Sequence, residues 1–148
     1  MATNQRMIFI NLPVADLDRS IAFYEALGAR KEPKFSNDKA AMMVLSDTIA
    51  VMLLRHEFYS TFINKPIADA HQSSEVLLCI SCESREAVDR MVDAAASAGG
   101  SPDPGPKQDM GMMYGRSFED PDGHHWEPMW MDPEAAEQGA HAVEEAAS

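Results

Sequence analysis

Hydrophobic and polar positions along this chain follow strand-like and helix-like periods in turn. The first half opens with a β-branched and aromatic run, Met7 to Val14, which predicts a strand. Apolar residues then recur at helical spacing, at Leu17, Ile21, Tyr24 and Leu27. Asp16 suits the N-cap of this helix, and Gly28 suits its C-terminal end. A weaker strand pattern over 30–36 and a pair of apolar runs over 40–56 complete a β-α-β-β-β order.

The second half of the chain follows the same order. A strand pattern over 74–82 precedes a second helix, for which Ser84 is the expected cap and Gly99 the expected end. The buried face of this helix is predicted to carry Val88, Met91, Val92 and Ala95. A Pro-rich segment over 101–107 indicates at most a poor edge strand. Two strand patterns between residues 110 and 131, joined by a Pro-Asp-Gly turn, close the repeat.

This repeated order predicts an α+β fold made of two βαβββ modules. We expect the first module over residues 1–56, a connector over 57–73 and the second module over 74–132. Residues 133–148 form an acidic tail rich in Ala and Glu. The tail composition favours helix, but no regular apolar stripe is present, so we expect a frayed or partly helical segment.

Composition narrows the range of partners and compartments. The chain has 148 residues and a formal net charge of −12, which argues against nucleic acid or an anionic membrane as a partner. Cys79 and Cys82 lie in a strand pattern and would point to opposite faces, so we interpret them as half-buried thiols rather than a redox pair. Two cysteines without a disulfide framework, no signal peptide and no membrane-length apolar segment predict a cytoplasmic protein.

The most informative stretch is RSFEDPDGHHWEPMWMD, residues 116–132. Its Asp-Pro-Asp-Gly segment predicts a turn, and the residues after the turn alternate. His125 and Glu127 are expected on one face of the strand, with Trp126 on the other. A carboxylate on a mostly apolar strand has either a buried partner, here Arg55 or Arg116, or a chemical role.

Two motifs resemble proteins of the vicinal oxygen chelate superfamily. NLPVADLDRSIAFYEALG resembles the opening of the first module in that family, and SFEDPDGHHWE resembles its closing motif. The subgroup with the most similar motifs is that of predicted lactoylglutathione lyases. The resemblance implies that two curved βαβββ sheets form a half-open barrel around a cleft, and that the protein is a homodimer. It also implies that metal-using members take one ligand from the first and last strand of each module.

The resemblance assigns the four ligand positions to particular residues of this chain. Glu127 corresponds to the last ligand, and Glu75, at the start of the second module, corresponds to the third. The other two positions correspond to Phe9 and Leu53, neither of which can bind a metal. Asn11, two residues after Phe9, is a weak ligand or a hydrogen-bond donor. Two carboxylates and water suit Mg²⁺ or Mn²⁺ and make a poor site for Zn²⁺, Ni²⁺ is a further candidate, and binding of no metal is the alternative.

Two functions follow from this resemblance. The first is a glyoxalase-like, metal-assisted isomerase or lyase acting on a small oxygenated substrate, with Glu127 as ligand or base and His125 as acid–base group. The second is a metal-free, drug-sequestering protein similar to bleomycin-resistance proteins. An extradiol dioxygenase is disfavoured, because it needs a second histidine beside the iron. The predicted pocket for the small-molecule ligand contains Phe9, Asn11, Leu53, Arg55, Tyr114 and Arg116.

Overall fold

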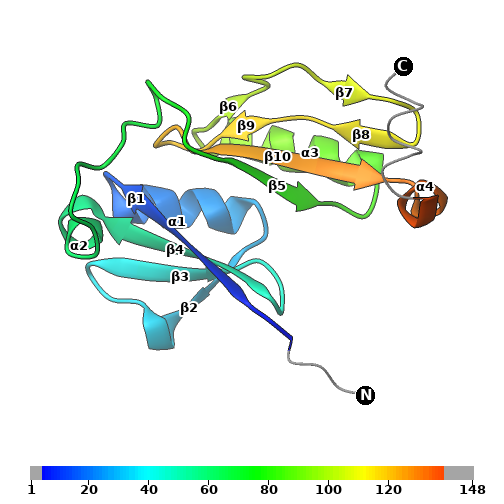
Figure 1. Cartoon of the computed structure of the whole chain (residues 1–148). Coiled ribbons are helices and arrows are strands. Elements are labelled where there is room, and N and C mark those ends of the chain that lie inside the picture. Colours follow the sequence, from blue (N-terminus) through cyan, green and yellow to red (C-terminus); the bar gives the residue numbers. More distant parts are fainter. Residues whose placement is uncertain (1–4, 139–148) are drawn as a thin grey trace. The chain divides into compact units, whose positions relative to one another are not determined.

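Each half of the chain folds into one sheet with one long helix packed against it (Figure 1). The computed structural model describes residues 5–138 and divides the chain into two units, Met1–Ser73 (unit 1) and Ser74–Ser148 (unit 2). Unit 1 contains β1 (Ile8–Val14), α1 (Leu17–Ala26), β2 (Arg30–Glu32), the 3-10 helix η1 (Pro33–Phe35), β3 (Ala40–Val44), β4 (Ile49–Arg55) and α2 (His56–Ser60). Unit 2 contains β5 (Leu77–Ser81), α3 (Arg85–Ser97), β6 (Ser101–Pro102), β7 (Gln108–Asp109), β8 (Met113–Gly115), β9 (Phe118–Glu119), β10 (His125–Met131) and α4 (Pro133–Gln138).

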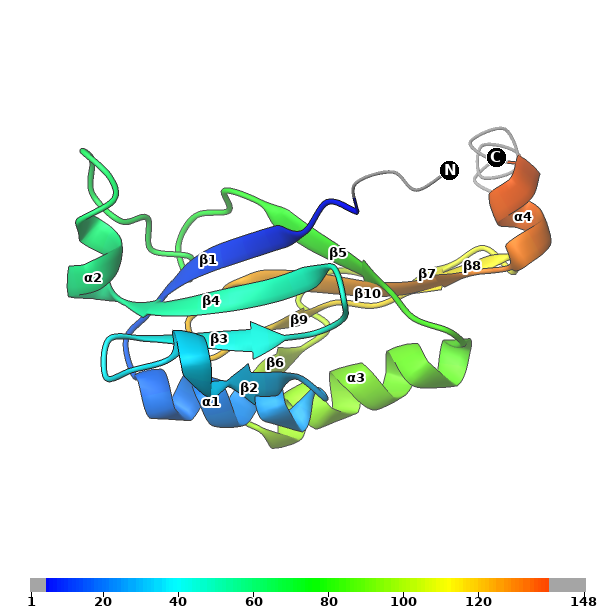
Figure 2. The ribbon, with the colours of Figure 1, turned by 90° about the horizontal axis from the view of Figure 1, so that it is seen from below.

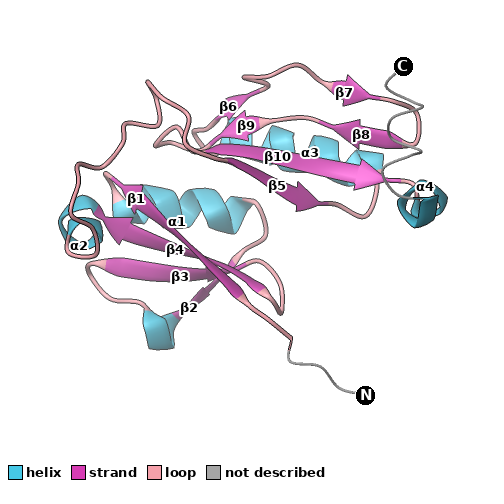
Figure 3. Ribbon diagram, viewed as in Figure 1, coloured by secondary structure: helices cyan, strands magenta, loops and turns pink. Residues whose placement is uncertain are grey.

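The two sheets have the same topology. In unit 1 the strand order is β1-β4-β3-β2, and β1 is parallel to β4 while the other pairs are antiparallel. In unit 2, β5 is parallel to β10, which pairs on its other edge with β8 and β9. β7 and β6 lie beyond these two strands (Figure 3). The α+β fold of two βαβββ modules is therefore confirmed.

The third strand of unit 2 is interrupted where the sequence predicted one continuous strand. β8 and β9 are separated by Arg116 and Ser117, and the register places Arg116 opposite Pro128 of β10. The Arg116 N–H donates to the Pro128 carbonyl (3.2 Å). Pro128 has no N–H group and cannot donate the second hydrogen bond of this residue pair. The hydrogen-bond ladder between the two strands is therefore interrupted here.

Both long helices begin and end as the sequence predicted. The Asp16 carboxylate accepts the Arg19 N–H (3.1 Å) at the start of α1, and the Ser84 hydroxyl oxygen accepts the Ala87 N–H (3.0 Å) at the start of α3. Each bond satisfies one of the free donors of the first helical turn. Gly28 and Gly99 follow the two C-caps, and both have φ of +101°.

The helices cover one face of each sheet. In unit 1, α1 packs on β3 and β4 (Figure 2), and the strand residues Met43, Val51 and Leu53 are completely buried. In unit 2, α3 packs on β10 and its neighbours through its buried side chains, Val88, Val92 and Ala95. Phe118 and Trp126 stack beneath it with ring centroids 6.4 Å apart. Burial of these apolar side chains is the main stabilising contribution to each unit.

The predicted tail is partly described. Its first residues form α4 (Pro133–Gln138), and the remainder, 139–148, lies outside the described residues. Among residues 5–138, no helix combines the length and the apolar character that crossing a membrane requires.

The matching helix ends give a test of the repeat. Gly28→Ala and Gly99→Ala should each lower the free energy of unfolding by about 1 kcal/mol, because a side chain is strained at positive φ. An added Cβ would meet no atom within 4 Å at either site, so the cost comes from the backbone alone. Urea unfolding followed by circular dichroism measures the change. Gly105→Ala, at a glycine without positive φ, is the control and should be close to neutral; equal losses in all three variants would contradict this account.

Candidate functional site

The turn before β10 fixes the orientation of that strand. The buried carboxylate of Asp120 accepts the N–H groups of Asp122 and His124, both at 2.9 Å. Gly123 supplies the positive φ, +89°, that closes the turn. Trp126 and Pro128 then enter the core under α3, so His125 and Glu127 point to the other face of the sheet. We call that surface the Glu127 face; it carries Leu77, Cys79, His125, Glu127 and Met129.

His125 and Glu127 form a pair on this face. The His125 Nε2 and Glu127 Oε2 atoms are 3.3 Å apart, with the His125 side chain 19% exposed and the Glu127 side chain 40% exposed. A hydrogen bond from the Gly105 N–H to the Ser117 hydroxyl oxygen (3.0 Å) holds the loop between β6 and β7 beside the imidazole of His125. A methyl group at Gly105 would lie 4.0 Å from His125 Cε1. The loop therefore shields the histidine and leaves the carboxylate accessible.

The parallel neighbour β5 contributes a thiol and an apolar side chain. Cys79 is directly opposite Glu127, and Leu77 is directly opposite His125. Both residues of β5 are exposed, Leu77 to 56%. Partial burial, followed by the nearby Glu127 carboxylate, raises the pKa of the Cys79 thiol. The thiol is therefore held protonated. Besides Glu127, this face carries the carboxylate of Glu119 of β9, directly opposite His125, together with hydrophobic and weakly polar groups.

Glu75 does not join this group. It precedes β5, is exposed, and lies four residues before the strand position that faces Glu127. It is not directly opposite any residue of β10 in the parallel pairing. Its role as a metal ligand stays a prediction.

The two unit 1 positions assigned by the resemblance lie on opposite faces of their sheet. Phe9 pairs with Ala50 and Leu12 pairs with Leu53, so Phe9 and Leu53 point in opposite directions. Leu53 is completely buried in the α1 core, whereas Phe9 is 48% exposed. Asn11 shares the face of Phe9 and donates its side-chain N–H to the Phe9 carbonyl (3.1 Å). Met52, rather than Leu53, is the β4 residue opposite Asn11 on that face.

Tyr114 and Arg116 face α3 rather than Glu127. The Tyr114 hydroxyl and the Arg116 guanidinium both donate to Asp89 of α3, at 2.7 and 3.0 Å. Arg116 also makes two hydrogen bonds to Asp103, at 3.0 and 2.7 Å, and its side chain is only 10% exposed. Within unit 2, Arg116 therefore pairs with Asp89 and Asp103 rather than with Glu127, and the place of Tyr114 and Arg116 in a ligand pocket stays a prediction. The Tyr114 hydroxyl is bonded to Asp89, and the Arg116 guanidinium is bonded to both Asp89 and Asp103.

These contacts shift the titration of the groups involved. The Arg116 hydrogen bonds lower the pKa of Asp103 below the ordinary value of 3.8. Hydrogen bonds from Tyr114, and then from Arg116, lower the pKa of Asp89 in the same way. The Asp103 carboxylate in turn raises the pKa of Arg116. The cluster is thus a stabilising polar contact between α3, β8 and the loop after β6.

The available donors do not fit the four-ligand metal site that the resemblance implies. Among residues 5–138, no three His, Cys, Asp or Glu side chains lie close enough together to hold one metal ion. Phe9 has no donor atom, Leu53 is buried, and Glu75 precedes β5 and has no partner in the β5–β10 pairing. The pair of His125 and Glu127 supplies two donors from a single strand.

Sequence reasoning missed the positions of Cys79 and Ser117. Cys79 is predicted to be a half-buried thiol, but it is exposed and lies directly opposite Glu127. The signal that could have found it is strand parity combined with the parallel pairing of β5 and β10. Ser117 could not be found in this way, because its role depends on the path of an irregular loop.

Comparison with known proteins identifies the family. The family model described as Glyoxalase/Bleomycin resistance protein/Dioxygenase superfamily matches residues 6–127. The chain therefore belongs to this superfamily. A search of curated proteins found no match.

Solved structures support the same fold. The hypothetical protein SA1046 from S. aureus is 26% identical with a TM-score of 0.72, and the match covers 87% of this chain and 95% of that one. A glyoxalase-related enzyme from Fulvimarina pelagi is 20% identical with a TM-score of 0.70, covering 86% and 88%. The fosfomycin resistance protein FosX from Mesorhizobium loti is 16% identical with a TM-score of 0.59, covering 85% and 91%. The last two likenesses show the fold alone.

The Arg116 cluster leads to a prediction about stability. Arg116→Met should lower the free energy of unfolding by about 2 kcal/mol at pH 7, less than for a fully buried ion pair because Asp89 is partly exposed. The lowered pKa values mean that Asp103 and Asp89 contribute fully above about pH 4, and that this contribution is lost as the pH falls further. Urea unfolding of both proteins at pH 7 and pH 3 measures the difference, which should shrink at pH 3. A loss of equal size at both pH values would show that the aspartates do not mediate the effect.

Proposed function

We propose that this protein binds a small organic molecule at the Glu127 face without a metal ion. The observation that carries the proposal is the Glu127 carboxylate, which is 40% exposed and has His125 as its recorded side-chain partner among the described residues. An accessible carboxylate beside exposed apolar groups is suited to binding rather than to packing. Sequestration, which the resemblance to bleomycin-resistance proteins implies, needs no bond-making step.

The groups on the face define the chemistry of the ligand. Glu127 is suited to accept a hydrogen bond from a protonated amine, and the charge of the amine would strengthen that bond. Leu77, which is exposed, and Met129 offer apolar contact on either side of it along the sheet. The formal net charge of −12 would attract a cation from solution. These features favour a small amphiphilic amine with an apolar or aromatic body.

A metal-assisted isomerase or lyase, similar to lactoylglutathione lyases, is the second candidate. It is favoured by one observation, the two adjacent donors of His125 and Glu127, 3.3 Å apart. The residues at two of the other family ligand positions argue against it, because Phe9 and Leu53 offer no ligand atom. The two candidates differ in what a divalent ion does to the protein.

A thermal-shift screen separates the two candidates. Aromatic amines such as tryptamine should raise the melting temperature of the protein, and the neutral analogue 3-methylindole should not. Glu127→Gln should weaken tryptamine binding by about tenfold or more, because a charge-assisted hydrogen bond is lost. The matched control is Glu86→Gln, which removes the same charge from an exposed position in the first turn of α3.

The same screen includes Mg²⁺, Mn²⁺, Ni²⁺ and Zn²⁺ alone. The proposal expects no stabilisation that depends on Glu127. A metal that stabilises the protein but not Glu127→Gln would contradict it and support the second candidate, for which turnover of the methylglyoxal–glutathione hemithioacetal is the direct assay.

A further inference from the structure

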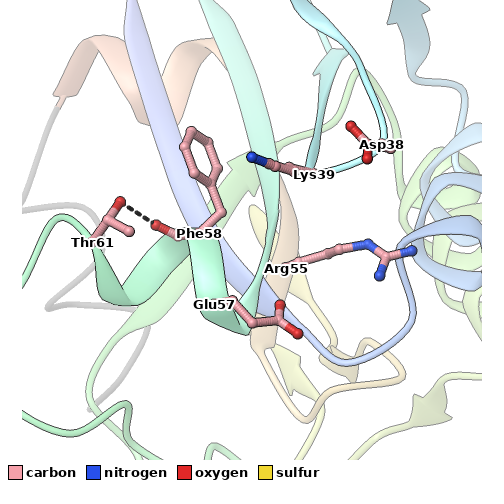
Figure 4. Close-up of a pocket in the computed structure, with 6 residues that line it drawn as sticks. All are labelled: Asp38, Lys39, Arg55, Glu57, Phe58 and Thr61. Atoms are coloured by element: carbon pink, nitrogen blue, oxygen red, sulfur yellow. Dashed lines mark hydrogen bonds between the residues drawn. The ribbon is translucent and has the colours of Figure 1, made fainter.

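The pocket of unit 1 lies where the start of β3, the end of β4 and α2 meet (Figure 4). Its volume is about 430 Å³, and it is lined by Asp38, Lys39, Arg55, Glu57, Phe58 and Thr61. In Figure 4 the Lys39 ammonium is directed toward Phe58, and the Arg55 guanidinium is directed away from it. The two cations therefore do not converge on one point, and the pocket does not define one ligand.

Three methionines form a row across three neighbouring strands of unit 2. Met113 of β8 is directly opposite Met131 of β10. On its other side, the Met113 carbonyl accepts the N–H of Met110 (2.8 Å), which extends the antiparallel pairing of β7 and β8 by one residue. Directly opposite residues of antiparallel strands carry their side chains on the same face, with Cβ atoms about 4.5–5.5 Å apart. The three thioether side chains are therefore neighbours on one face of the sheet.

The hairpin between β7 and β8 fixes the position of Met110. Gly111 lies at the first position of its two-residue loop and has the positive φ, +78°, that such a loop needs there. The Asp109 carboxylate accepts the Gly111 N–H (3.1 Å), and the Arg85 guanidinium donates to the Gly111 carbonyl (3.0 Å). These contacts hold the loop, so Met110 is positioned beside Met113 before any ligand binds.

The row lies on the face of the sheet opposite α3. Arg85 of α3 lies over the rings of Tyr114 and Trp130, with its Cζ atom 4.9 and 5.6 Å from their centroids. Met113 and Met131 are the strand neighbours of these two aromatic residues, so they point to the other face. All three methionines of the row are half-buried. The row is therefore partly open to solvent and is not part of the core beneath α3.

The side chains of the row offer one kind of ligand atom. A methionine sulfur is an uncharged, polarisable thioether, and such soft ligands favour Cu(I), whereas Mg²⁺ favours oxygen. Glu127 lies four residues before Met131 on β10, about 13 Å away at a rise of roughly 3.3 Å per residue, so its carboxylate does not belong to the row. The formal net charge of −12 would attract a cation to the protein.

We propose that Met110, Met113 and Met131 bind one Cu(I) ion through their three sulfur atoms. The site uses neither His125 nor Glu127, and its ligands differ from those that the family resemblance implies. It therefore goes beyond the proposed function. Failure of either proposal would leave the other unaffected.

Titration of the full chain with Ag(I), a redox-stable analogue of Cu(I), tests the proposal. The protein for this test carries Cys79→Ser and Cys82→Ser, because free thiols are also soft ligands. Isotope labelling of the methionine methyl groups gives an NMR signal for each of the 11 methionines. The methyl signals of Met110, Met113 and Met131 should shift together and saturate at one equivalent of Ag(I). Mg²⁺ should shift none of them.

Variants of the row locate the binding. Met113→Leu and Met131→Leu should each weaken Ag(I) binding by about tenfold or more, since even loss of an outer-shell contact costs about 10–100-fold in metal affinity. Leucine keeps an apolar side chain of similar volume, so the melting temperatures of both variants should stay close to that of the parent. Met7→Leu removes an exposed methionine of unit 1 and should leave the affinity unchanged.

Three results would each overturn the proposal. They are the absence of a saturable shift with Ag(I), shifts at Met7 equal to those of the row, and an unchanged affinity in both Met113→Leu and Met131→Leu.

Discussion

The alternation of side chains along β10 is the constraint on which the rest of unit 2 depends. Trp126 and Pro128 are buried under α3, and this burial forces His125 and Glu127 to the opposite face. A slip of one residue would expose the tryptophan and bury the carboxylate beneath a helix. Loss of a buried aromatic side chain costs about 3–5 kcal/mol, and burial of an unpaired charge costs more. The core thus decides which groups are available to a ligand.

The two units share one topology, but the sheet faces opposite their helices differ in chemistry. The parallel pair β1–β4 presents Phe9, Asn11 and Met52, whereas the equivalent pair β5–β10 presents Cys79, His125 and Glu127. The faces that contact the helices are apolar in both units. Members of one superfamily can therefore keep the fold while the faces opposite the helices change their chemistry. In this chain the ionisable groups of these two faces are concentrated in the second unit, and unit 1 gathers its charges at the end of β4 instead.

The sequence predicted local structure well and long-range contacts poorly. Asp16, Ser84, Gly28 and Gly99 were assigned correctly because capping and positive φ depend on a few neighbouring residues. The faces of His125 and Glu127 followed from strand parity alone. The sequence placed Leu53 with Phe9, and Tyr114 and Arg116 with Glu127. In the structure Leu53 and Phe9 lie on opposite faces of their sheet, and Arg116 bonds to Asp89 of α3. Register and ion pairing depend on distant segments, which local patterns do not reveal. The homodimer, the cytoplasmic location and the ligand roles of the site residues remain predictions.

The most direct test of the β10 arrangement is the alkylation rate of Cys79 in the native protein. In a Cys82→Ser background, iodoacetamide reacts with this one thiol, and the reaction requires its thiolate. Because burial, and then the Glu127 carboxylate, raises the pKa of Cys79, Glu127→Gln should increase the native rate at pH 8, with no change in unfolded protein. An unchanged native rate, or labelling only after unfolding, would show that Cys79 and Glu127 do not share an accessible face.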